Sequence, residues 1–122
     1  MNTAADRANR ARWQQFSLYT ILIMVFIGIF TNLSTIALIA FAGESIHIPL
    51  TVIIILVNLL VAAGVVDGIS DWDAVRLDYD EEEKKTNLAE RYAQTNTSFF
   101  KVLLCTIFVG VALAQLYVIY TT

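Results

Sequence analysis

The chain has 122 residues, of which 57% are hydrophobic and 16% charged, with a mean hydropathy of +0.65. A soluble domain usually carries about 25% charged residues, so this composition excludes an ordinary soluble domain and predicts an integral membrane protein. A single cysteine excludes an intramolecular disulfide, a single histidine excludes a multi-histidine metal site, and the net charge of −3 gives no reason to expect nucleic acid as a partner.

Residues 1–17 form a predicted N-terminal arm, and residues 18–41 follow as the first predicted span. The span holds no charged residue and is longer than the ~20 residues that a ~30 Å hydrocarbon core requires. Basic residues before an apolar run that ends in small residues are also typical of a secretory signal peptide. The apolar run is longer than the roughly 7–15 residues of such a signal, so we expect a retained anchor.

Residues 42–47 form a short predicted outer loop, and residues 48–66 form the second predicted span. Pro49 suits the first turn of a helix, where its missing N–H is no loss. Because the loop is short, the first two spans are predicted to form an antiparallel hairpin. His47 could supply one ligand to a haem or chlorophyll held by another subunit, although a plain loop histidine is the simpler interpretation.

Residues 67–100 form an acidic connection, predicted to be cytoplasmic and helical. We expect the second span to end at Asp67, close enough to the membrane surface for this carboxylate to remain hydrated. Ser70 and Asp73 have the spacing of a capping box, which predicts that a new helix begins there.

A second start signal, Asn87 with Glu90, lies later in the connection. It leaves two alternatives: two short helices broken near Thr86, or one helix that bends into the third span. Trp72 and Tyr79 share one helical face, which we expect to rest on the membrane surface.

Eight acidic and four basic residues lie between positions 70 and 97, so this segment carries a net charge of −4. Anionic headgroups should repel it, which makes it a better candidate for docking a basic protein surface. A solvated surface is the simpler interpretation. Val75 and Arg76 stand where a calcium loop needs a ligand and a glycine, so no metal site is predicted. The candidate docking residues are Asp67, Asp71, Asp73 and Asp78.

Residues 101–120 are the third predicted span, which starts at Lys101. All eight basic residues lie before the first span or between the second span and Lys101. The positive-inside rule therefore predicts a cytoplasmic N-terminus and an outer C-terminus. The predicted fold is an all-α membrane protein with three transmembrane helices and an amphipathic helical connection between the second and third.

Three amide side chains are expected at one level within the spans: Asn32, Asn58 and Gln115. Amides in hydrocarbon bond to each other across helices, typically for about 0.6–2 kcal/mol per bond, which predicts an interhelical clamp within the chain or to a neighbouring subunit. The alternative is the lining of a solute path. We favour the clamp because a path for ions would normally show an ionisable residue at depth.

Two small-xxx-small patterns predict close helix contacts: Gly64 with Gly68, and Gly110 with Ala114. Asp67 lies inside the first pattern. An ordinary boundary charge is the simpler interpretation of Asp67, but as a carboxylate paired with a basic residue of a partner it is the best single functional candidate in the chain.

The sequence contains no arrangement of nucleophile, base and acid and no glycine-rich phosphate loop, so we do not expect an enzyme. The order of two spans, an amphipathic stretch and a third span resembles the longer form of the small subunit of the bacterial protein translocon. The basic Trp-Pro hinge of that family has no counterpart in this sequence. The membrane anchors of succinate dehydrogenase share only the number of spans. We therefore assign no family.

These features predict a non-catalytic accessory or structural subunit of a larger integral membrane complex. Its partners would be other membrane subunits and the lipid bilayer, with lipid contacts but no cofactor of its own. The alternatives are a homo-oligomeric channel or transporter lined by the three amides, and a membrane-protein insertion or assembly factor. The expected location is a prokaryotic inner membrane or a virus-derived membrane.

Overall fold

The computed structural model describes residues 3–121, and every regular element in this range is a helix. The elements are α1 (Ala4–Phe41), the short 3₁₀ helix η1 (Glu44–Ile46), α2 (His47–Leu77), α3 (Glu81–Lys84), α4 (Asn87–Ala93) and α5 (Thr97–Thr121). Helices α1, α2 and α5 are long and apolar enough to cross a membrane. This confirms the predicted all-helical fold with three helices of spanning length.

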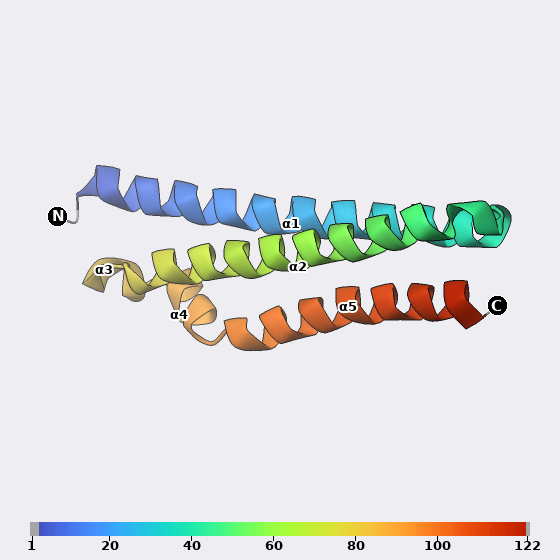
Figure 1. The fold of residues 1–122 in the computed structure, drawn as a ribbon. Helices are drawn as coiled ribbons and strands as arrows, with labels where there is room; N and C mark the ends of the chain where they lie inside the picture. Colours follow the sequence, from blue (N-terminus) through green and yellow to red (C-terminus); the bar gives the residue numbers. More distant parts are fainter. Residues whose placement is uncertain (1–2, 122) are drawn as a thin grey trace.

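The three long helices lie side by side, with α2 between α1 and α5 (Figure 1). The short helices α3 and α4 gather at the end of the bundle where α1 begins. We call this end, formed by residues 3–17 and 70–101, the charged end. The other end, formed by residues 42–48 and 121, is called the opposite end. A hydrogen bond of 2.7 Å joins the hydroxyls of Thr51 and Tyr120 near the opposite end.

The predicted N-terminal arm is helical and continuous with the first span in α1. Thr3 caps this helix: its hydroxyl accepts a hydrogen bond from the N–H of Asp6, and the Asp6 carboxylate accepts one from the N–H of Thr3. Both bonds satisfy N–H groups that a helix start leaves without partners. The charged arm is therefore a rigid extension of the spanning helix.

The second spanning helix also extends further than predicted. Helix α2 passes through Asp67 and Ser70 without a break, so the predicted helix start at Ser70 is wrong. The apolar side of α2 continues beyond Asp67, because Gly68 lies against α1 and Ile69 is buried. Continued packing keeps the segment helical where the local capping signal favoured a new start.

The connection after α2 consists of two short helices, with the chain leaving helical geometry between Lys84 and Asn87. Thr86 is the N-cap of α4, and its hydroxyl accepts a hydrogen bond of 3.1 Å from the N–H of Ala89. Asn96 precedes α5, and its side-chain oxygen accepts a bond of 3.0 Å from the N–H of Phe99. Helix α5 thus begins four residues before the predicted span.

Two apolar clusters hold α2 against its neighbours. One lies toward the opposite end and contains Leu50, Ile54, Ala112 and Ile119, and the other contains Val61, Val65, Ile69 and Phe108. Gly28 allows the second cluster to form, because a Cβ at this position would overlap the ring of Phe108. The glycine lets an aromatic side chain of α5 reach the backbone of α1.

Candidate functional site

Three amide side chains meet inside the bundle. The Nδ2 atoms of Asn32 and Asn58 each donate to the Oδ1 atom of the other residue, at 2.9 and 3.1 Å. Gln115 Nε2 donates to Asn32 Oδ1 at 2.8 Å. All three side chains are buried. The structure therefore brings together the three residues that the sequence placed at one level, one from each long helix.

The amide groups make further hydrogen bonds to backbone carbonyls of their own helices and to the Thr35 hydroxyl. Asn32 Nδ2 also donates to the Gly28 carbonyl at 2.8 Å, and Asn58 Nδ2 to the Ile54 carbonyl at 2.7 Å. The Thr35 hydroxyl donates to Gln115 Oε1. Thr35 was not predicted, although its place three residues after Asn32 puts both on one helical face. The cluster fixes the register of three helices and satisfies its own polar groups.

The two small-residue patterns have different surroundings. A Cβ at Gly64 would lie 2.7 Å from the Met24 side chain, and one at Gly68 would lie 2.7 Å from Ile21. These glycines let α1 approach α2 closely. A Cβ added at Gly110 would meet no atom of the described residues within 4 Å, and Ala114 is exposed. Gly110 therefore makes no close helix contact within residues 3–121, whereas Ala114 lines a hollow with Ile36 and Ile39 of α1.

Asp67 is exposed on α2 and lies at the edge of a shallow open hollow between α2 and α5. The same hollow is lined by Ser70, Cys105 and several small or apolar residues of α2. Cys105 lies four residues beyond Lys101, which corresponds to about 6 Å along the helix axis. Gly68, next to Asp67, lies against Ile21 in the apolar run of α1. A Cβ at Gly68 would also lie 3.6 Å from the Ser17 carbonyl oxygen, so Asp67 lies about where the apolar run of α1 begins.

The other candidate docking carboxylates are spread over the last turns of α2. Asp71 lies one turn after Asp67 and is exposed, as is Asp78. Asp73 is half-buried, and Arg76 Nη2 lies 2.5 Å from its Oδ1 atom. Asp67 and Asp71 thus share a face, whereas Asp73 already has a cation from its own helix.

An ion-pair cluster that the sequence did not predict closes the charged end. Arg7 Nε lies 2.6 Å from Asp80 Oδ2, and Arg7 Nη1 lies 3.2 Å from Glu82 Oε2. Arg10 Nε donates to Glu83 Oε1 at 3.0 Å, and its Nη2 lies 3.5 Å from Asp80 Oδ2. Asp80 and Glu83 are therefore bound to the chain's own arginines and largely withdrawn from solvent, whereas Glu82 pairs with Arg7 but remains exposed.

Asp80 has the least exposed carboxylate of this cluster. Its side chain is 5% exposed, and it caps α3 by accepting a hydrogen bond of 2.8 Å from the N–H of Glu83. This backbone bond, followed by the Arg7 guanidinium, lowers the pKa of the Asp80 carboxyl. Asp80 therefore stays ionised in the ion-pair cluster at neutral pH.

Two half-buried aromatic residues, Trp72 and Tyr79, make contacts within the chain. The ring centroids of Trp72 and Tyr92 are 4.8 Å apart in an edge-to-face arrangement. Tyr79 donates its hydroxyl hydrogen to Gln14 Oε1 in α1, and burial raises the pKa of this hydroxyl. Together with the ion pairs, these contacts make the charged end a folded cap on the bundle.

His47 is the first residue of α2 and is half-buried at the opposite end. Its carbonyl accepts a hydrogen bond of 2.7 Å from the Thr51 hydroxyl. No group of three histidine, cysteine, aspartate or glutamate side chains within residues 3–121 is arranged to hold a metal ion.

Comparison of the chain with protein-family models, curated proteins and solved structures found no match.

Proposed function

We propose that this chain is a non-catalytic structural subunit of a larger integral membrane complex, and that Asp67 contacts a basic residue of a partner helix. The observation that carries the proposal is the position of Asp67, which is exposed on α2 close to where the apolar run of α1 begins. No cation of the described residues forms an ion pair with it.

A lipid-facing carboxylate at this level is unfavourable. A charged side chain costs about 2.5–3.5 kcal/mol at the centre of a membrane helix and less toward the headgroups. A lysine or arginine of a partner would offset this cost by pairing with Asp67. Ala62 and Ala63 line the same hollow as Asp67, and small side chains let a second helix approach closely.

A second outward feature favours assembly in the same way. Gly110 lies on a face of α5 that α1 and α2 leave uncovered, and the exposed Ala114 lines an open hollow one turn further along α5. Surfaces of this kind let helix backbones approach in a bilayer, where packing replaces the hydrophobic effect as the driving force. The chain thus offers one contact surface on α2, at Asp67, and one on α5, at Gly110.

The channel alternative has less support. Its lining residues would be Asn32, Asn58 and Gln115, yet these side chains are buried and bind one another. A residue that lines a solute path would present free donors or acceptors to that path. The mutual hydrogen bonds favour the clamp. An insertion or assembly factor would use the same outward surfaces, but only transiently.

The proposed orientation places the charged end in the cytoplasm, since it holds the basic residues of the chain. Asp71 and Asp78 remain exposed there and are suited to a basic cytoplasmic surface. The expected location remains a prokaryotic inner membrane or a virus-derived membrane.

Native mass spectrometry after extraction in mild detergent tests the proposal. We expect unlike membrane subunits at fixed stoichiometry with the parent chain and a marked loss of them with Asp67→Asn. Asp78→Asn is the matched control, because it removes an exposed carboxylate beyond the apolar level and should keep the partners. A ring of identical chains would contradict the proposal and favour a channel, and substoichiometric partners would favour an assembly factor.

A further inference from the structure

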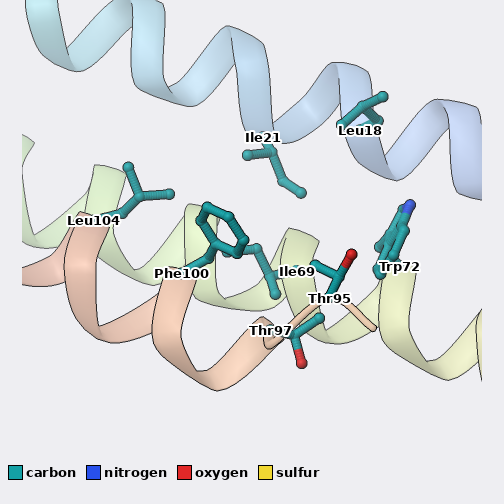
Figure 2. A pocket seen from close by; sticks show the side chains of 8 residues that line it. All are labelled: Leu18, Ile21, Ile69, Trp72, Thr95, Thr97, Phe100 and Leu104. Atoms are coloured by element: carbon teal, nitrogen blue, oxygen red, sulfur yellow. The ribbon is translucent and has the colours of Figure 1, made fainter. Parts of the chain in front are cut away.

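An apolar hollow opens between the long helices next to the charged end. Leu18 and Ile21 of α1, Ile69 and Trp72 of α2, and Phe100 and Leu104 of α5 line it. Figure 2 shows these side chains converging from the three helices. Leu18 and Ile21 lie at the start of the apolar run of α1, whereas Trp72, Thr95, Thr97 and Phe100 belong to the charged end. The hollow therefore lies at the boundary where the part of the bundle that faces hydrocarbon in a membrane begins. A lipid acyl chain is the molecule that this medium supplies.

A polar hollow adjoins the apolar one. Thr95 and Phe100 line both, and Arg91, Gln94 and Asn96 complete the polar hollow. Arg91 is exposed and forms no ion pair within the part of the chain that the structure describes. A guanidinium and two amides at the mouth of an apolar hollow match the phosphate of a lipid headgroup.

The charge of this region differs from that of the whole connection. Asp80, Glu82 and Glu83 are bound to arginines of α1. From Thr86 to Lys101 the only acidic residue is Glu90, against the two bases Arg91 and Lys101. The net charge of −4 between positions 70 and 97 therefore comes from the residues before Thr86, and the stretch from Thr86 to Lys101 carries a net charge of +1.

Short contacts fix the helix that carries Arg91. Arg76 Nη1 donates to the Tyr92 carbonyl at 3.2 Å, and Trp72 packs against the Tyr92 ring. The Thr95 hydroxyl donates to the Arg91 carbonyl at 3.3 Å. Trp72 thus lines the apolar hollow and also packs against α4, the helix whose Arg91 lines the polar hollow.

We propose that these two hollows form a binding site for one anionic glycerophospholipid. An acyl chain occupies the apolar hollow, and the phosphate lies against Arg91, Gln94 and Asn96. A net anionic headgroup is preferred over phosphatidylcholine, because the choline cation would meet a locally basic surface. The site requires that the helices lie in a bilayer, but it does not depend on the proposed subunit contact at Asp67.

Fluorescence quenching of Trp72 tests this site. Trp13→Phe leaves Trp72 as the sole tryptophan, because the chain contains two. We expect a small fraction of phosphatidylglycerol with brominated acyl chains to quench Trp72 more strongly than the same fraction of brominated phosphatidylcholine, in otherwise unlabelled phosphatidylcholine vesicles. Excess inorganic phosphate should leave this difference unchanged, since the acyl chain contributes to binding. Loss of the difference would show that free phosphate displaces the lipid from Arg91, Gln94 and Asn96, and would overturn the assignment of a lipid as the preferred ligand.

Two variants separate the headgroup from the acyl chain. Arg91→Gln should lower the preference for phosphatidylglycerol by about threefold to fivefold, whereas Lys85→Gln, which removes the same charge outside both hollows, should keep it. Leu18→Phe fills the apolar hollow at a partly exposed position and should weaken quenching by both lipids. Equal quenching by the two lipids in the parent, or equal effects of the Arg91 and Lys85 variants, would overturn the proposal.

Discussion

Arg7 and Asp80 are 73 positions apart in the chain, yet the Nε atom of the arginine lies 2.6 Å from a carboxylate oxygen of the aspartate. The contact joins the first turn of α1 to the start of α3. It exists because α1 and α2 both continue past the apolar spans and carry their charged ends side by side. The pair therefore reports whether the charged end of the bundle is closed.

We predict that acid opens the charged end only below pH ~4. The pKa of Asp80 is lowered in the folded chain, so the stability from its ion pairs is fully present above the ordinary aspartate value of about 3.9 and is lost as the pH falls through the lowered value. Spin labels at Asn9 and Lys85, in a Cys105→Ser background, measure the distance across this contact. It should stay constant from pH 8 to pH ~4.5 and broaden in stronger acid.

Two variants test this assignment. Asp80→Asn should broaden the distance distribution already at neutral pH, because the Arg7 and Arg10 guanidinium groups lose their shared carboxylate. Glu81→Gln is the matched control, since Glu81 is exposed and lies 3.7 Å from Lys84 alone. A transition near pH 6 would assign the closure to groups other than Asp80.

The amide cluster predicts a stability effect. Asn58→Leu removes the two hydrogen bonds between Asn58 and Asn32 and leaves the amide of Asn32 with fewer bonds in an apolar setting. We expect a loss of about 0.5–2 kcal/mol in the free energy of unfolding in detergent. Ser34→Ala is the control, because the exposed Ser34 hydroxyl bonds only to the Phe30 carbonyl of its own helix. Unchanged stability together with loss of solute flux would favour the channel alternative.

The spans and the amide cluster could be anticipated from the sequence because each depends on local composition. An uncharged apolar run that is long enough to cross the bilayer as a helix satisfies all its backbone hydrogen bonds in that conformation. Such a run is therefore expected to be helical in lipid. Asn32, Asn58 and Gln115 stand out because amides are rare in such runs. Thr35 escaped notice because threonine is common in membrane helices and here completes the cluster only through a partner on α5.

The charged end could not be read in the same way. Ser70 and Asp73 carry a valid local capping signal, but the packing of Gly68 and Ile69 keeps α2 helical through them. The sequence also gives no sign of which arginines meet which acids, since that depends on how far two helices project beyond the membrane. The pairing of Glu83 with Arg10, for example, depends only on where the two helices bring these residues in the folded chain.

We expect replacement of a glycine by alanine to have opposite effects on stability in α1 and in α5. Gly28→Ala should destabilise the chain by about 1–3 kcal/mol, because the new Cβ would overlap the Phe108 ring. Gly110→Ala meets open space and should be neutral or stabilising by up to about 1 kcal/mol through helix propensity. Thermal unfolding of both variants in one detergent checks this contrast. Equal destabilisation would mean that the outward face of α5 is packed after all.

The orientation predicts a labelling pattern. In a Cys105→Ser background, a cysteine at Lys84 should react with an impermeant reagent only from the cytoplasmic side, and a cysteine at Thr121 only from the outer side. The reason is that all eight basic residues of the chain lie in the charged end, and the positive-inside rule places such an end in the cytoplasm. Reaction of both positions from one side would show that α5 does not cross the membrane and would contradict the three-span topology.

Asp67 and Asp71 lie one turn apart on the same face of α2, and we expect their removal to affect partner binding differently. If a partner helix pairs with Asp67, Asp67→Asn should weaken co-purification strongly and almost independently of salt, because a buried basic residue of the partner loses its counterion. Asp71→Asn removes an exposed charge one turn further toward the charged end, so its smaller effect should fade as added salt shortens the screening length to about 8 Å or less. Neither change touches the basic residues that set orientation, so insertion should be normal for both. Co-purification across a salt series measures the difference. If Asp67→Asn retains its partners as the parent does at every salt concentration, the carboxylate is an ordinary boundary charge and the partner contact lies elsewhere.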